Sequence, residues 1–253
     1  MNKTKSIVII TVVTLLFVIA AIYYFLAFKN KKISEDVSNL ELPNIIMVDE
    51  KGTTTFNKKN LDESLQLVGK SDLSDVEKAG LVYMLEEEKL AYDAYTVLFQ
   101  RFSQVTFDNI AKSEQNHTEA VRNLVERYGL PDPSLNKVAG EFENADLKKL
   151  YVELLNKGTK TIKDSLEVGA AIEEIDILDL QERIAQTDNQ DIILVYENLM
   201  KGSRNHLRAF TKNFKNLTGQ DYVPQYLSKS DYDSIVGAEI ERGGAGMGKG
   251  RNR

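Results

Sequence analysis

The sequence predicts an all-α protein: a four-helix bundle with a short crossover helix, preceded by one transmembrane helix. Several long segments repeat apolar residues at intervals of three and four, which is typical of helices with one buried face. The chain of 253 residues contains no tryptophan and only four prolines, and it is long enough for one bundle with flanking segments. An uncharged apolar run at residues 7–28 is long enough to cross a membrane as a helix.

The composition excludes several classes of function. The formal net charge of −6 gives no basis for nucleic acid as a partner. The chain has no cysteine, so it can form no disulfide, no thiolate metal site and no cysteine nucleophile. Neither observation indicates an oligomeric state.

Residues 1–32 are predicted to be a transmembrane signal-anchor with basic flanks. The apolar run ends in bulky aromatic residues, where a signal peptidase would require small ones, so we expect the segment to stay uncleaved. The short basic tail before the run favours a cytoplasmic N terminus, whereas the lysines after it favour the reverse. We expect a single-pass protein of the cell membrane with an extracytoplasmic domain.

The rest of the chain divides into three parts. Residues 33–70 are polar and rich in turns, and they are interpreted as a linker with an extended piece around residues 44–48. Residues 71–235 carry the helical periodicity of the bundle. Residues 236–253 form a glycine-rich basic tail that is expected to be disordered, because ordering such a chain costs much conformational entropy.

The first bundle helix is expected to begin at Ser74, because Glu77 three residues later completes a capping box. Glu88 lies within its apolar stripe, where an unpaired carboxylate would be costly. Glu86 is interpreted as part of a solvated face, and Glu87 remains a second choice for the inward carboxylate.

The second helix spans about residues 107–128 and ends before Gly129 and Pro131. Its apolar stripe is interrupted at the middle by Glu114 and His117, which share a face because they are three residues apart. By itself, a Glu-x-x-His spacing is weak evidence for a metal site. Its position within the stripe, opposite a helix with its own embedded glutamate, strengthens it.

The second half of the bundle repeats this pattern. A connection with a short helix at residues 147–156 leads to a third long helix at 162–187, in which Glu173 is the embedded carboxylate and Asp176 lies near the same face. The fourth helix, at about 190–216, places His206 inward. A long connection between two helical hairpins suits a bundle with one crossover.

Several segments of these helices resemble the sequences of two known groups of proteins. Glu88, Ala91 and Tyr95, followed by Glu114 and His117, resemble the first two helices of rubrerythrin and other ferritin-like proteins. Over about residues 73–233 the closer resemblance is to the DUF2202 family of the ferritin-like superfamily. It is carried by residues 86–91, 113–117, 173–177 and 202–210.

The resemblance implies a metal site in the bundle. It makes Glu88, Glu173 and His206 ligands, and it makes Glu114 a bridging carboxylate beside His117. The sequence departs from the ferritin-like pattern at Ser203, where a second Glu-x-x-His would place its glutamate. Asp176 could reach in instead; alternatively the site holds one metal, or the fold has kept no metal.

Two functions follow from this reading. The first is a membrane-anchored protein that binds iron, as a di-iron or mononuclear site, or manganese, with redox or oxygen/peroxide chemistry as an iron-dependent oxidoreductase. The absence of a rubredoxin-type cysteine set would require an external electron donor, and Tyr92 and Tyr95 are packing aromatics or radical partners. The second is a non-enzymatic surface-tethered binding or scaffold module with a vestigial metal site.

Overall fold

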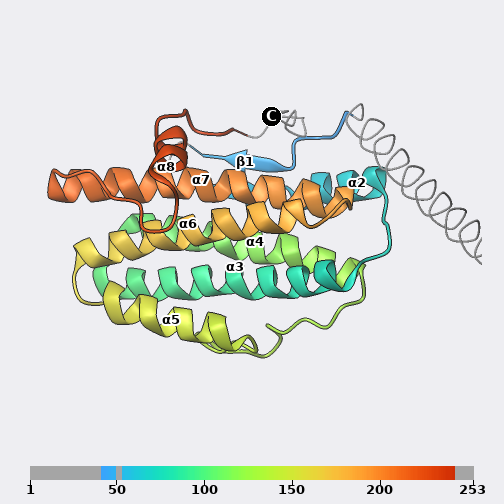
Figure 1. The fold of residues 1–253 in the computed structure, drawn as a ribbon, viewed down its shortest axis with the longest axis horizontal. Coiled ribbons are helices and arrows are strands. Elements are labelled where there is room, and N and C mark those ends of the chain that lie inside the picture. The colour runs from blue at the N-terminus through green and yellow to red at the C-terminus, as the bar shows by residue number, and fades with distance from the viewer. Residues whose placement is uncertain (1–40, 50–52, 243–253) are drawn as a thin grey trace, which may run out of the picture. The chain divides into compact units, whose positions relative to one another are not determined.

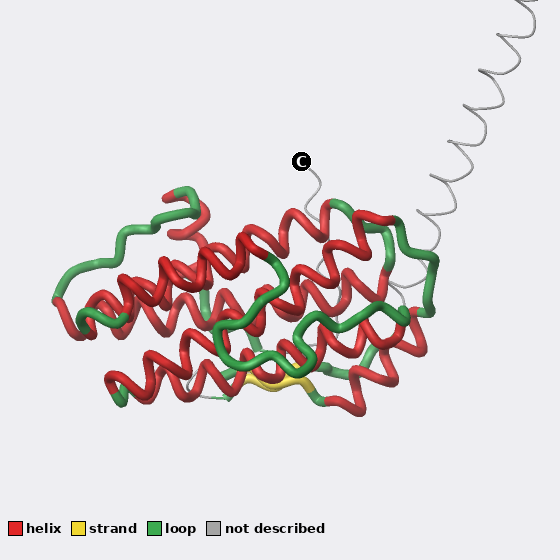
Figure 2. Tube along the Cα trace, turned by 90° about the horizontal axis from the view of Figure 1, so that it is seen from below, coloured by secondary structure: helices red, strands yellow, loops and turns green. Residues whose placement is uncertain are grey.

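The computed structural model describes residues 41–49 and 53–242. Four long helices lie side by side and form a bundle (Figure 1): α3 (Asp75–Phe102), α4 (Val105–Arg127), α6 (Ile162–Ala185) and α7 (Gln190–Thr218). Around them lie the short elements β1 (Ile46–Val48), β2 (Thr54–Phe56), α2 (Lys58–Val68), α5 (Ala145–Gly158) and α8 (Lys229–Val236). The two strands, yellow in Figure 2, are a minor part of a chain that is otherwise helix and loop.

Local sequence signals set the ends of the long helices. Ser74 and Glu77 form the expected capping box at the start of α3. Ser103 ends α3 with a left-handed φ of 54°, and only two residues separate α3 from α4, so these helices must be antiparallel neighbours. Gly219 ends α7 with a φ of 73°, a conformation that glycine adopts without steric cost.

Contacts between side chains establish the topology. Tyr83 and Tyr95 on α3 bond to Asp179 and Glu173 on α6, so the chain directions of these helices are opposite. Gln104, the N-cap residue of α4, bonds to Asn213 on α7, and Phe107 packs on Phe210, so this pair of helices is also antiparallel. The bundle is therefore up-down-down-up, and the long connection that carries α5 links its two hairpins.

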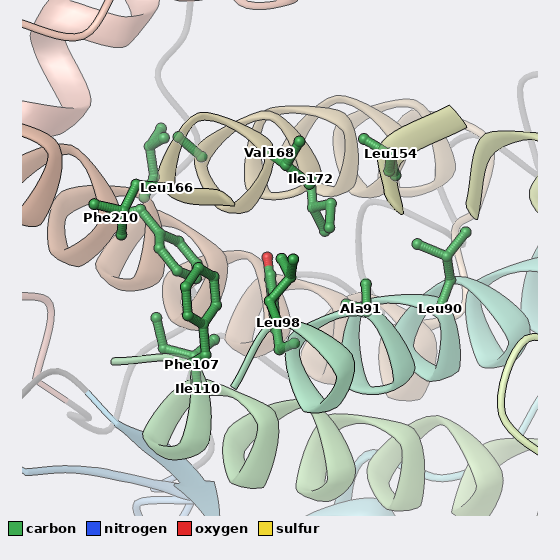
Figure 3. Packing of buried hydrophobic residues seen from close by; sticks show 14 of the residues in the cluster. Leu90, Ala91, Leu98, Phe107, Ile110, Leu154, Leu166, Val168, Ile172 and Phe210 are labelled. Atoms are coloured by element: carbon green, nitrogen blue, oxygen red, sulfur yellow. The ribbon is translucent and has the colours of Figure 1, made fainter. Parts of the chain in front are cut away.

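The core consists of two apolar clusters with a polar band between them. One cluster includes Leu98 and Phe107, whose ring lies 5.3 Å from that of Phe210 (Figure 3). The other includes Leu85 and Leu124, toward the opposite ends of the same helices. In α3, α4 and α7 the predicted inward carboxylates and histidines fall between the two clusters in the sequence, and in α6 Glu173 lies between Ile172 and Ile177 of the first cluster, so apolar layers enclose them on both sides.

The structure corrects the predicted membrane anchor. Within residues 41–49 and 53–242, every helix is too short or too polar to span a bilayer. Each long bundle helix carries charged side chains along its exposed surface. The transmembrane helix of the predicted fold, the membrane as a partner and the single-pass cell-membrane location are therefore not upheld. Residues 1–32, on which these predictions rested, lie outside the described residues.

The interpretation of residues 33–70 as a linker is also corrected where the structure describes them. β1 and β2 form an antiparallel hairpin in which Ile46 pairs with Phe56, followed by α2. Buried apolar side chains attach this segment to the bundle core: Leu42, Ile45, Ile46, Leu61 and Leu65. Burial of these side chains offsets the entropy of ordering the segment. The extended piece expected around residues 44–48 is present as β1.

The first part of the predicted disordered tail, residues 236–242, contacts the bundle. Residues 236–242 are described, and Glu241 pairs with both Arg204 and Arg208 of α7. Two charge-assisted contacts hold this part of the predicted disordered tail against the bundle. Residues 243–253, for which disorder was also predicted, lie outside the described residues.

Candidate metal centre

Each long helix contributes to one buried cluster of carboxylates and imidazoles at the middle of the bundle. Glu88 comes from α3, Glu114 and His117 from α4, Glu173 from α6 and His206 from α7. None of these side chains is more than 3% exposed. The structure thus brings together five of the six predicted site residues, and it favours Glu88 over Glu87 as the inward carboxylate of α3.

The cluster consists of two groups of three ligand atoms that share Glu114. One group is Glu88, Glu114 and His117, and the other is Glu114, Glu173 and His206. Nδ1 of His117 lies 2.9 Å from Oε2 of Glu114 and 3.4 Å from a Glu88 oxygen. Nδ1 of His206 lies 2.8 Å from the other Glu114 oxygen and 3.5 Å from Glu173. The two oxygens of Glu114 therefore face one histidine each.

Several of these atoms lack a hydrogen-bond partner. Both ring nitrogens of His117 and His206, Oε1 of Glu88 and Oε1 of Glu114 are buried without one. The distances are short, but the ring N–H groups do not point at the oxygens. Atoms bound to one ion at about 2.0–2.2 Å lie about 3 Å from one another when their bonds are roughly perpendicular. The residues present therefore fit a metal ion in each group.

The electrostatics of the cluster require compensating positive charge. Burial raises the pKa of Glu88 to about 8 and that of Glu173 to about 7. For Glu114 the desolvation caused by burial is outweighed by the two imidazoles, which hold its pKa below the usual range. The pKa of His206 rises to about 9, because Glu114 and Glu173 outweigh its own desolvation. Protons on the histidines supply the charge that bound cations would otherwise supply.

The chain is similar to one described protein family and to a relative of known structure. The family model described as "Uncharacterized protein domain (DUF2202)" matches residues 77–239. The chain belongs to the DUF2202 family. Uncharacterized protein MJ0754 of Methanocaldococcus jannaschii is 49% identical over 181 residues, which cover 72% of this chain and 97% of the relative. The crystal structure of hypothetical protein MJ0754 from Methanococcus jannaschii matches at a TM-score of 0.67 and 49% identity, covering 68% of this chain and 98% of that one.

Asp176, the sixth predicted ligand, stands apart in this DUF2202 bundle. It is buried, and the hydroxyl of Ser203 lies against its Oδ2. Its Oδ1 has no hydrogen-bond partner, and neither ligand group contains Asp176. Burial, followed by repulsion from Glu88, raises its pKa well above the ordinary value. Its assignment as a metal ligand stays a prediction.

Sequence reasoning gave Tyr95 only a packing or radical role, and it missed Gly202 and Phe56, although all three hold the buried cluster in place. The hydroxyl of Tyr95 donates to Oε1 of Glu173 at 2.5 Å and orients that carboxylate. A Cβ on Gly202 would lie 2.6 Å from the His117 ring, so only glycine leaves room for it. Phe56 of β2 meets the same ring edge-on with its centroid 5.9 Å away. The contacts of Gly202 and Phe56 cross between elements, so helical periodicity carried no signal of them.

Glu86 was also misassigned. The sequence placed it on a solvated face, but it is only 2% exposed and accepts from the backbone N–H groups of Glu143 and Asn144. Asn144 is the N-cap residue of α5, so Glu86 fixes the start of that helix against α3. Three consecutive glutamates of this DUF2202 chain thus have different environments, and Glu88 is the one in the ligand cluster.

Proposed function

We propose that this protein is a ferritin-like metalloprotein that holds two iron ions, or two manganese ions, in the bundle core and uses them in redox chemistry with dioxygen or peroxide. The observation that carries the proposal is the pair of buried Glu/His groups that share Glu114. Oxygen and imidazole donors suit iron and manganese.

The topology supports the ferritin-like relationship. Ferritin-like bundles have one long crossover connection, and their di-metal sites take carboxylates and histidines from all four helices. Here α5 lies in the single long connection between the hairpins, and each of the four long helices contributes at least one member of the cluster. A metal pair would supply one-electron redox chemistry toward an oxygen species.

The chain's own residues would bind and enclose such a pair. Glu88 and His117 would hold one ion, Glu173 and His206 the other, and Glu114 would bridge them. Tyr95 fixes the orientation of Glu173 through its hydroxyl. The apolar layers on both sides exclude water, which strengthens electrostatic interactions inside the cluster. Electrons would have to come from an external donor, because the chain has no cysteine to hold a relay cluster.

One observation favours a second function. Ser203 stands where a ferritin-like Glu-x-x-His would place a carboxylate, and it bonds to Asp176 outside both groups. A bundle that had lost one bridge could serve as a non-enzymatic binding or scaffold module with a vestigial site. Such a protein would fold and act without metal.

Metal analysis separates the two functions. We expect the purified full-length protein, reconstituted anaerobically with Fe²⁺ or Mn²⁺, to bind about two ions per chain. Glu114→Gln keeps the shape of the side chain but removes the shared charge, so it should bind almost none. Glu119→Gln, an exposed position on the same helix, should bind as the wild type does.

Two results would reject the metalloprotein. One is a well-folded wild type that holds neither metal after reconstitution. The other is a His117→Ala/His206→Ala variant that retains the wild-type metal content. The scaffold function requires a wild-type protein that folds well and holds neither metal.

A further inference from the structure

A groove between α4 and α7 has no part in the proposed metal site. It has a cavity volume of about 550 Å³. The first turns of α4 form one wall, the second half of α7 forms the other, and Ile240 lies at the edge. The volume falls within the range of about 300–1,000 Å³ that is usual for small-molecule sites. None of the metal-ligand residues lines it.

The charge of the groove is positive although the protein is acidic overall. Its lining contains Arg208 and Lys212 and no aspartate or glutamate. Arg208 is already engaged, because its guanidinium donates to the Ile235 carbonyl, to Oδ1 of Asn205 and to Glu241. Lys212 is exposed and makes no ion pair within residues 41–49 and 53–242. The groove therefore presents uncompensated positive charge in a chain of net charge −6.

Polar side chains in the groove have unused hydrogen-bonding capacity. Thr106, Asn109 and Asn216 make no side-chain hydrogen bond to any described part of the chain. By contrast, Asn205 and Asn213 are occupied by Glu241 and Gln104. The free amide and hydroxyl donors lie along the same groove as Lys212, so an oxygen-rich group could receive several hydrogen bonds there.

The groove also has an apolar edge that is open to solvent. Val105 is 56% exposed and Ile240 is 38% exposed, and both line it. Ile110 also lines the groove and is buried. Apolar area next to fixed positive charge suits a ligand that has both characters.

We propose that this groove binds a small amphiphilic anion, with a carboxylate or phosphate head at Lys212 and an apolar body against Val105 and Ile240. The charged and hydrogen-bonding side chains would select the head group, and the apolar edge would add affinity in proportion to the area it buries. This site is independent of the metal centre and does not rest on the function proposed for it.

Calorimetric titration of the full-length protein tests the proposal. Octanoate and octyl phosphate are the probes, with inorganic phosphate as a head group without a body and octanol as a body without a head. We expect saturable binding of at least one of the two amphiphiles. Which of them binds more tightly distinguishes a carboxylate from a phosphate head. Inorganic phosphate and octanol should each bind at least about tenfold more weakly, since each lacks half of the contacts.

Charge-reversal variants assign any binding to the groove. Lys212→Glu should weaken amphiphile binding at least about fivefold, because an attraction becomes a repulsion. Lys215→Glu lies on the same helix outside the groove, and should change binding less than about twofold. Asn109→Asp should also weaken binding, whereas Asn116→Asp on the same helix should not. Circular dichroism melts confirm that each variant folds.

Three outcomes would overturn the proposal. One is the absence of saturable binding for both amphiphiles. Another is inorganic phosphate or octanol binding as tightly as the amphiphiles do. The third is equal weakening by Lys212→Glu and Lys215→Glu, which would indicate a general charge effect.

Discussion

At the scale of single residues, two adjacent glutamates of α6 have separate tasks. Glu173 faces His206, with Oε2 3.5 Å from Nδ1. Glu174 turns the other way and is fully buried. Its carboxylate accepts from the hydroxyl of Tyr222 and from the backbone N–H groups of residues 225–227, which fixes the segment after α7. One side chain belongs to the ligand cluster and the other to the scaffold.

Isosteric changes at these two positions should separate the two tasks. Glu173→Gln should lower the metal content toward one ion per chain, because the His206 group loses a charged ligand. Glu174→Gln should retain the metal but lower the free energy of unfolding by about 2–4 kcal/mol, because an amide cannot accept all of these bonds. Metal analysis and urea unfolding measure the two effects. If Glu174→Gln lost metal and Glu173→Gln did not, this division of tasks would be wrong.

At the scale of elements, Glu77 connects the start of α3 to the loop between α6 and α7. One carboxylate oxygen accepts from the N–H and hydroxyl of Ser74, each at 2.7 Å. The other accepts from the Thr187 hydroxyl and, at 2.7 Å, from the Asn189 amide. Burial by itself would raise the pKa of Glu77, but these hydrogen bonds outweigh it and hold the pKa below its usual value.

This shift predicts an acid-dependent loss of stability. The pKa of Glu77 is lower in the folded state than in the unfolded state. Its contribution is therefore complete above the unfolded value of about 4.3, and it disappears as pH falls through the folded value. We expect Glu77→Gln to cost about 1–2 kcal/mol at neutral pH and progressively less below pH 4.

Urea unfolding of both proteins between pH 3 and pH 7 measures this difference. Glu126→Gln, an exposed position near the end of α4, is the control and should run parallel to the wild type. A Glu77→Gln penalty that stays constant with pH would show that the carboxylate charge is not what stabilises the junction.

At the scale of the whole molecule, the fold concentrates titratable groups where four helices meet. Without a cation, carboxylate attraction raises the pKa of His117 well above its ordinary value and that of His206 to about 9, despite the opposing effect of burial. Burial raises the pKa of Glu88 to about 8. Metal ligands must be deprotonated to bind, so protons compete with a metal ion for these side chains.

Metal binding should therefore release protons and strengthen as pH rises. At pH 7 the raised pKa values mean that the histidines and much of Glu88 carry protons that a metal must displace. We expect Mn²⁺ affinity to increase from pH 6 to about pH 9, because these groups give up their protons more readily as pH rises. Calorimetry in two buffers of different ionisation enthalpy counts the protons. Affinity independent of pH, with no proton release, would contradict the proposed ligand set.

Much of the helical framework could be predicted from the sequence. The capping box at Ser74, the ends at Gly129 and Gly219 and the apolar stripes are local signals, and the observed helices follow them within a few residues. The position of Glu88, Glu114 and His117 within those stripes predicted inward side chains because helical periodicity determines which residues share a face. Short sequence segments on these helices predicted membership of the DUF2202 family. The family match confirms it.

Other features depend on contacts between segments far apart in the chain. Leu61 and Leu65 lie in a polar stretch, and only their packing against apolar side chains of the bundle makes them core residues. Glu86 has the same local surroundings as Glu88, but the start of α5 covers it.

The sequence by itself therefore determined the helices, their inward faces and the carboxylates and imidazoles that point inward, because these depend on spacing along one chain segment. Only the tertiary structure decided that one oxygen of Glu114 faces His117 and the other faces His206. It also decided that Asp176 pairs with Ser203 outside both groups. These facts depend on how helices approach one another, and side-chain distances across a bundle are set by packing rather than by spacing in sequence.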